Sequence, residues 1–123
     1  MSKAEPPIDE AHARELLQRE RQRIESSLAD LRRVREGELD QLDTDLNLLD
    51  DGEVIGDEGV EDALAEQLRR QLAAVERAEG RLEDGSYGFS VESGEPIASQ
   101  RLEAIPWAER TPSEQERYER THG

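Results

Sequence analysis

The chain has 123 residues, enough for one domain or for one long element with a small module. Charged residues make up 38% of it and aromatic residues only 3%, and the formal net charge is −15, which argues against a large globular core. A coiled coil needs only a narrow apolar seam, so helical periodicity can still organise such a chain.

The negative charge is concentrated between Glu36 and Asp62, where twelve acidic residues occur without a single Lys or Arg. Phosphate backbones would be repelled there, which argues against direct nucleic-acid binding through this region. The chain has no cysteine, and this excludes disulfides and thiolate metal sites. No apolar run approaches the roughly 20 residues of a membrane span. The N-terminus lacks the apolar core of a signal peptide, so we expect a cytoplasmic location and no membrane contact.

The first 49 residues predict a short tail and a long helix. Residues 1–8 contain Pro6–Pro7 and are expected to be a disordered tail, and Asp9 can cap a helix that begins near Glu10. The helix is expected to run to about Leu49, roughly 40 residues, with Gly37 as a weak point in its interior and not a break. Its apolar stripe comprises Leu17, Ile24, Leu28, Leu31, Val34, Leu39, Leu42, Leu46 and Leu49.

A turn and a second helix follow. Residues 50–59 hold three glycines and no helical stripe, and are expected to form an acidic turn. The stripe then resumes at Val60, Leu64, Leu68, Leu72, Val75 and Leu82. Two amphipathic helices joined by a short loop fold back on each other, so residues 9–84 predict an antiparallel coiled-coil hairpin with its acidic tip near 50–59. The stripe is expected to be core packing, with dimerisation through an exposed part as the alternative.

Residues 85–123 predict a small module and a short C-terminal helix that follow the hairpin. Gly85 is a candidate left-handed residue that ends the second helix, and residues 86–107 are expected to form a small module with short strands. Thr111, Pro112 and Glu114 have the pattern of a helix start, with Thr111 as N-cap and Glu114 closing a capping box. The last helix is expected to reach about Arg120. The fold class is therefore mainly α, a long hairpin with a small module and a short C-terminal helix.

The segment from Leu82 to Glu119 resembles the DksA/TraR family of bacterial transcription regulators. The matching residues are Asp84–Gly85, Tyr87–Gly88, Gly94, Pro96–Ile97, Arg101–Leu102, Ala104, Pro106 and Ala108. In that family the pattern "DGxYGxCxxCGxxIxxxRLxAxPxAxxCxxC" forms a C4 zinc ribbon at the base of a coiled-coil hairpin. The resemblance extends from about Asp9 to Tyr118, and it implies a ribbon-like module here.

The family's four zinc cysteines fall on Ser90, Ser93, Thr111 and Glu114. Their spacing survives, but hydroxyls and one carboxylate do not replace thiolate or imidazole ligands, so we expect no zinc and no other cofactor. We expect the capping box to stabilise the module in place of metal, together with an apolar cluster. The expected members of that cluster are Tyr87, Phe89, Val91, Ile97, Leu102, Ile105, Trp107 and Tyr118.

The resemblance also implies that the tip of the hairpin contacts a partner. Family members insert their coiled coil into the secondary channel of RNA polymerase, and acidic residues at the tip act near the catalytic magnesium. The family's DxxDxA tip motif falls on Asn47, Asp50 and Gly52, so only the second aspartate is kept, with Asp51 and Glu53 beside it. Together with Asp57 these residues are the candidate partner-binding tip, the alternative being a solvated loop that carries charge.

We therefore expect a non-enzymatic regulator that binds RNA polymerase through an acidic coiled-coil finger. The alternative is a coiled-coil interaction or adaptor protein that acts on another protein partner. Either could be a monomer or a homodimer. No catalytic triad, glycine-rich phosphate loop or metalloprotease pattern is present, and a hairpin offers no pocket to shift the pKa values of its carboxylates.

Overall fold

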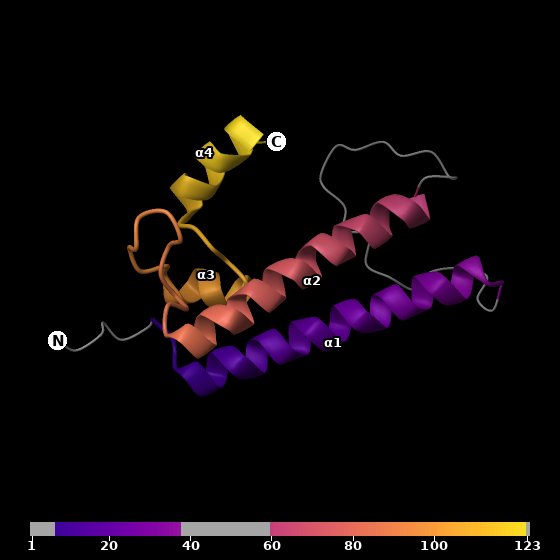
Figure 1. Cartoon of the computed structure of the whole chain (residues 1–123), viewed down its shortest axis with the longest axis horizontal. Helices are drawn as coiled ribbons and strands as arrows, with labels where there is room; N and C mark the ends of the chain where they lie inside the picture. The colour runs from indigo at the N-terminus through magenta and orange to yellow at the C-terminus, as the bar shows by residue number, and fades with distance from the viewer. Residues whose placement is uncertain (1–6, 38–59, 123) are drawn as a thin grey trace. The chain divides into compact units, whose positions relative to one another are not determined.

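The computed structural model describes residues 7–37 and 60–122, which form four helices (Figure 1). These are α1 (Glu10–Arg35), α2 (Val60–Asp84), α3 (Ser99–Ala104) and α4 (Pro112–His122). The expected mainly helical fold is confirmed. The short strands expected within 86–107 are not found in the described part of the chain, where extended pairing is limited to an isolated antiparallel bridge between Phe89 and Pro96. None of the described helices is long and apolar enough to cross a membrane.

The chain divides into two compact units. One, here called the terminal unit, comprises residues 1–19 and 74–123, and the other, the central unit, comprises residues 20–73. Each unit therefore contains a part of α1 and a part of α2. The sequence predicts a different division, with a helical hairpin at 9–84 and a small module at 85–123. That division stays a prediction.

Helix α1 begins as expected and ends earlier than expected. Asp9 caps it, with its carboxylate accepting a hydrogen bond from the backbone N–H of His12 at 3.3 Å. The helix ends at Arg35 because Gly37 takes a left-handed conformation with φ of 83°, and its N–H bonds the carbonyl of Val34 at 3.0 Å. The expectation that the helix continues through Gly37 is thus wrong. The part of the stripe from Leu39 to Leu49 lies outside the described residues.

Helix α2 agrees with its sequence at both ends. Glu61 and Asp62 lie in its first turn, where the helix dipole favours negative charge. At its other end Gly85 has φ of 84°, and the N–H of Ser86 reaches back to the carbonyl of Arg81 at 2.9 Å. This is the Schellman arrangement, and it confirms Gly85 as the residue that ends the helix.

Within the central unit, α1 and α2 lie side by side and run in opposite directions (Figure 1). Arg35 pairs with Asp62, and Arg23 donates to Gln71 at 3.4 Å, which fixes the antiparallel order. The apolar stripe fills the interface between the helices, and its buried members are Ile24, Leu31, Leu64, Ala65 and Leu68. Burial of a large apolar side chain contributes about 1.5–3 kcal/mol, so this narrow core can hold two highly charged helices together.

The terminal unit is built around the first turns of α1 and the last turns of α2. Buried residues from these turns are Ala13, Leu17, Ala74, Val75, Ala78 and Leu82, and Ile8, just before α1, is buried with them. The residues after Gly85 add Tyr87, Ile97, Leu102 and Ala108 to the same core. The short helix α3, which the sequence did not predict, carries Leu102 into this core. The start of α1 contacts the C-terminal module, where His12 Nε2 lies 2.7 Å from the Glu103 carboxylate.

The expected apolar cluster is only partly formed. Tyr87, Ile97 and Leu102 are buried, while Phe89, Ile105 and Trp107 are half-buried. Val91 and Tyr118 are 48% and 37% exposed, so their assignment to the cluster is wrong. Tyr118 instead packs against polar groups, since the guanidinium of Arg110 lies 3.9 Å from its ring centroid and the ring of His122 stacks on it at 4.1 Å.

Candidate functional site

The predicted partner-binding tip cannot be placed on the fold. Asn47, Asp50, Asp51, Glu53 and Asp57 all lie outside the described residues. Their role therefore stays a proposal, and the described features that bear on function are a groove in the central unit and the four former cysteine positions in the terminal unit.

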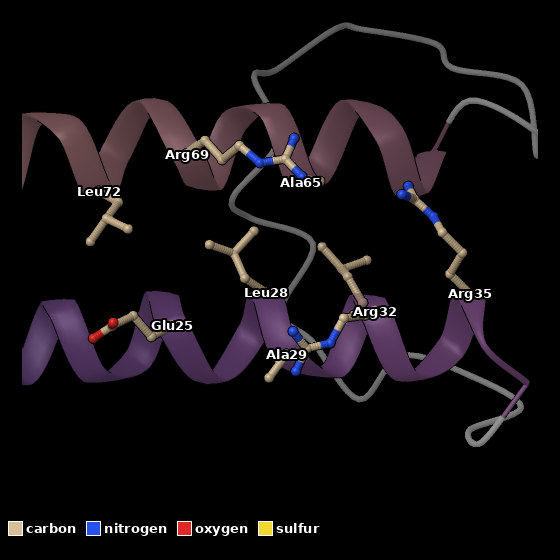
Figure 2. Close-up of a pocket in the computed structure, with 9 residues that line it drawn as sticks. Glu25, Leu28, Ala29, Arg32, Arg35, Ala65, Arg69 and Leu72 are labelled. Carbon is tan, nitrogen blue, oxygen red and sulfur yellow. The ribbon is translucent and has the colours of Figure 1, made fainter.

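The groove in the central unit lies between α1 and α2 and has a volume of about 460 Å³. Its apolar residues come from both helices, and Figure 2 shows Leu28 of α1 and Leu72 of α2 pointing into the space between them. Both leucines are half-buried, unlike the fully packed Ile24 and Leu68. The remaining lining residues are Glu25, Ala29, Leu31, Arg32, Arg35, Ala65 and Arg69. The groove thus combines an apolar floor with three arginines, in a chain whose net charge is −15.

The terminal unit brings the four former cysteine positions together. Ser90 opens a tight turn, since its hydroxyl accepts hydrogen bonds from the backbone N–H groups of Glu92 at 3.0 Å and Ser93 at 3.2 Å. Gly94 closes the turn with φ of 76°, and its N–H bonds the Ser90 carbonyl at 3.0 Å. Ser90 is buried, with 5% of its surface exposed. The turn therefore presents the Ser90 hydroxyl to the interior of the unit.

Glu114 meets this turn from the start of α4. Its carboxylate accepts the backbone N–H of Thr111 at 2.9 Å, and the Thr111 hydroxyl accepts the N–H of Glu114 at 3.4 Å. These two bonds form the capping box expected from the sequence. The hydroxyls of Ser90 and Ser93 lie near the same carboxylate. Hydrogen bonding to the carboxylate, with Ser90 as the largest cause, lowers the pKa of Glu114 to about 2. The side chain is therefore an anion at neutral pH, although only 5% of its residue surface is exposed.

These four residues do not fit a zinc ion. The chain contains no cysteine, so the four thiolates of a C4 site cannot be supplied. The two histidines are engaged elsewhere: His12 Nε2 lies 2.7 Å from Glu103, and His122 Nδ1 lies 3.0 Å from the Tyr118 carbonyl. Across residues 7–37 and 60–122, no three His, Asp or Glu side chains gather as metal ligands would. The module is therefore held by other interactions.

Ion pairs tie the Ser90 turn to the segment before α4. Arg110 Nε lies 2.7 Å from Glu92 Oε2, and the N–H of Val91 donates to the Glu109 carbonyl at 2.8 Å. Glu109 in turn lies 2.7 Å from Arg77 on α2. The Arg110 backbone carbonyl accepts the guanidinium N–H of Arg101 at 3.0 Å. The segment before α4 is thus held to the turn, to α2 and to α3.

Two further polar side chains, Tyr87 and Arg81, have buried polar atoms near the end of α2. The Tyr87 hydroxyl donates to the Pro106 carbonyl at 2.8 Å, and burial raises the pKa of this phenol to about 12. Burial also lowers the pKa of Arg81, and within the described residues its buried Nη2 has no hydrogen-bond partner. The sequence predicted the burial of Tyr87 but not the hydrogen bond of its hydroxyl, and it gave no indication that Arg81 is partly buried. The sequence signal for Tyr87 was the Tyr87–Gly88 pair, which comes shortly after the end of the helix.

Comparisons with known proteins point in one direction. Residues 85–120 match the family model described as "Prokaryotic dksA/traR C4-type zinc finger". The chain is 42% identical over 64 residues to the RNA polymerase-binding transcription factor DksA of Caulobacter vibrioides strain NA1000 / CB15N, a match that covers 52% of this chain and 45% of that protein. It is 34% identical over 67 residues to general stress protein 16O of Bacillus subtilis strain 168, which covers 54% and 41%. The matches thus span less than half of the length of these relatives.

The fold is similar to a solved structure over more of the chain. The transcription factor DksA2 from Pseudomonas aeruginosa superposes with a TM-score of 0.60 at 29% identity, covering 91% of this chain and 84% of that chain. The hairpin and the C-terminal module are therefore both part of the likeness. The names of the DksA relatives describe transcription factors, in agreement with the expectation of a non-enzymatic protein.

Proposed function

The chain is a cysteine-free member of the DksA/TraR family, and on that premise we propose that it is a transcription regulator that binds RNA polymerase. The observation that carries the proposal is the fold likeness to DksA2 over 91% of the chain, together with 42% identity to a protein named for polymerase binding. The sequence matches cover less than half of the length of these relatives. Polymerase binding by this chain is therefore the proposal to be tested.

The proposed contact is the acidic finger formed by the hairpin. Residues 38–59, which connect α1 and α2, contain nine acidic residues and no basic one. Carboxylates at Asp50, Asp51, Glu53 and Asp57 would be attracted to a basic protein channel and repelled by nucleic acid. The family resemblance makes the secondary channel of RNA polymerase the expected channel. Such a protein works in the cytoplasm, beside the polymerase.

Capture with purified core RNA polymerase tests the proposal. The folded wild-type chain should bind the polymerase at low salt, and binding should weaken as salt screens the charges. The triple variant D50K/D51K/E53K should lose binding. A matched triple reversal on exposed helical positions, E83K/E116K/E119K, changes the net charge equally and should retain it. If folded wild-type protein is not retained at low salt, the proposal is wrong.

A dimeric interaction protein is the second candidate, and the groove of the central unit favours it. Half-buried Leu28 and Leu72 offer apolar area, and Arg32 and Arg69 offer positive charge beside Arg35, which pairs with Asp62. A second copy of this acidic chain would supply the complementary charge. Sedimentation equilibrium separates the candidates: L28D should dissociate such a dimer, whereas A73D, on an exposed position of α2, should not. A monomer at all concentrations would exclude this candidate.

A further inference from the structure

We infer that the groove of the central unit is a self-complementary surface, on which a second copy of this chain packs across a two-fold axis with its α1 antiparallel to the first. The inference deepens the second candidate function, the dimeric interaction protein, on which it rests, and it does not depend on polymerase binding. A two-fold interface presents the same surface patch on both copies, so each contact between two different residues occurs twice. A patch fits such an interface when its features are complementary to themselves after the rotation.

Four residues of α1 that line the groove have this property. In chain order they are Glu25, Leu28, Ala29 and Arg32, and Figure 2 shows them along one stretch of the helix. A two-fold axis that passes between Leu28 and Ala29 exchanges position 25 with position 32, and position 28 with position 29. Glu25 then meets Arg32 of the second copy, and Leu28 packs on the small Ala29 of the second copy. Opposite charges meet at both ends of the contact, and a large side chain meets a small one in its middle.

The groove residues of α2 agree with the same axis. Ala65 and Leu72 are seven residues apart, as Glu25 and Arg32 are, so an axis through their midpoint places the half-buried Leu72 on Ala65 of the second copy. The midpoints on α1 and α2 lie at the same level of the antiparallel pair, because both are equally many residues away from the ion pair of Arg35 with Asp62. A single axis therefore serves both helices, and the two copies form a four-helix bundle.

Glu25 and Arg32 are available for contacts between copies. Several other arginines of α1 pair with glutamates one turn away on the same helix. Glu25 and Arg32 are exposed, and no ion pair joins either of them to another residue within 7–37 and 60–122. Half-buried Leu28 and Leu72 leave apolar area that the second copy would remove from water. The groove thus offers both the charges and the apolar surface that the contact requires.

The arrangement also determines where like charges lie. The two α1 helices end at opposite ends of the interface, which keeps apart the starting points of the two segments 38–59, each with nine acidic residues. The arrangement matches Arg32 but not Arg69, because Arg69 lies beside the axis and faces Arg69 of the second copy. R69Q should therefore strengthen the association, whereas R32Q should weaken it.

Charge exchange tests the two-fold arrangement by sedimentation equilibrium of the full chain. E25R and R32E should each raise the dissociation constant of the dimer by about tenfold, because the axis makes each substitution change two contacts. An equimolar mixture of the two variants should regain the wild-type affinity, since only a pair of unlike copies then has opposite charges at both ends. E116R and R117E, matched changes at exposed positions of α4, should have no effect.

The outcomes separate this inference from the function on which it rests. A dimer that responds equally to E25R and E116R would keep the second candidate function and overturn the two-fold arrangement. A loss of affinity that the mixture of E25R and R32E does not restore would show that the substitutions act on the fold of each copy, and would also overturn it. A wild-type chain that is a monomer at all concentrations would overturn both the arrangement and the second candidate function.

Discussion

The hydroxyl of Tyr87 donates a hydrogen bond to the backbone carbonyl of Pro106, 2.8 Å away and nineteen residues further along the chain. It joins the segment just beyond the end of α2 to the segment just beyond the end of α3. Tyr87 is 3% exposed, so the phenol brings a polar atom into the core of the terminal unit and satisfies a carbonyl there.

Replacing Tyr87 by Phe should destabilise the protein by about 1–3 kcal/mol, because the buried Pro106 carbonyl loses its donor while the ring is kept. Urea denaturation gives the free energy of unfolding directly. Tyr118→Phe is the matched control, since Tyr118 is 37% exposed and lies outside the core. Equal effects of the two substitutions would show that the hydrogen bond contributes nothing.

Leu68→Ala should cost about 2–5 kcal/mol, because Leu68 is fully buried in the central unit and its loss leaves a cavity. Leu28→Ala removes the same atoms from a half-buried position at the groove, so it should cost clearly less. The comparison uses the midpoints of thermal or urea unfolding. If Leu28→Ala proved as costly as Leu68→Ala, the groove would have to be filled in solution.

The stability of the chain should depend on pH through Glu114. Its pKa is about 2 in the folded state against 4.5 for the ordinary carboxyl, so the folded state holds the proton less tightly than the unfolded state. This contribution is fully present above about pH 4.5 and is lost as the pH falls towards 2. In E114Q the urea midpoint should fall less steeply over this range, while E116Q should keep the wild-type slope.

Two glycines should respond to alanine in opposite directions. Gly37 has φ of 83°, where an L-residue is strained by about 1–2 kcal/mol, so Gly37→Ala should lower the free energy of unfolding. Gly80 lies inside α2 with ordinary helical geometry and nothing within 4 Å of an added Cβ, so Gly80→Ala should raise it by about 1 kcal/mol. A stabilising Gly37→Ala would indicate that α1 continues beyond Arg35 in solution.

Features that depend on neighbouring residues along the chain were predictable from the sequence. The bounds of α2, the left-handed Gly85 and the pairing of Thr111 with Glu114 all follow from local periodicity or capping chemistry. Gly37 was misjudged because the same residue can be tolerated inside a helix or can end it, and the leucine spacing beyond it appeared to continue.

Several features that depend on tertiary contacts were not predictable. The six residues of α3 are too few to show a periodic pattern, and their helix is fixed by the burial of Leu102. Val91 and Tyr118 were expected in the core because they are apolar or aromatic, but one is exposed on the Ser90 turn and the other packs against Arg110. Ser90 and Glu114 are near each other although they are far apart in the sequence, and only the family resemblance indicated this.

The chemistry of Ser90, Ser93, Thr111 and Glu114, which occupy the former cysteine positions, has a consequence for the conditions under which the terminal unit stays folded. Thiolates in a zinc ribbon can be oxidised to sulfenic acid or to disulfides, and the metal is then released. Hydroxyls, a carboxylate and backbone amides undergo neither reaction. The terminal unit of this chain should therefore keep its fold in the presence of peroxide or under scarcity of zinc, where a four-cysteine ribbon would come apart.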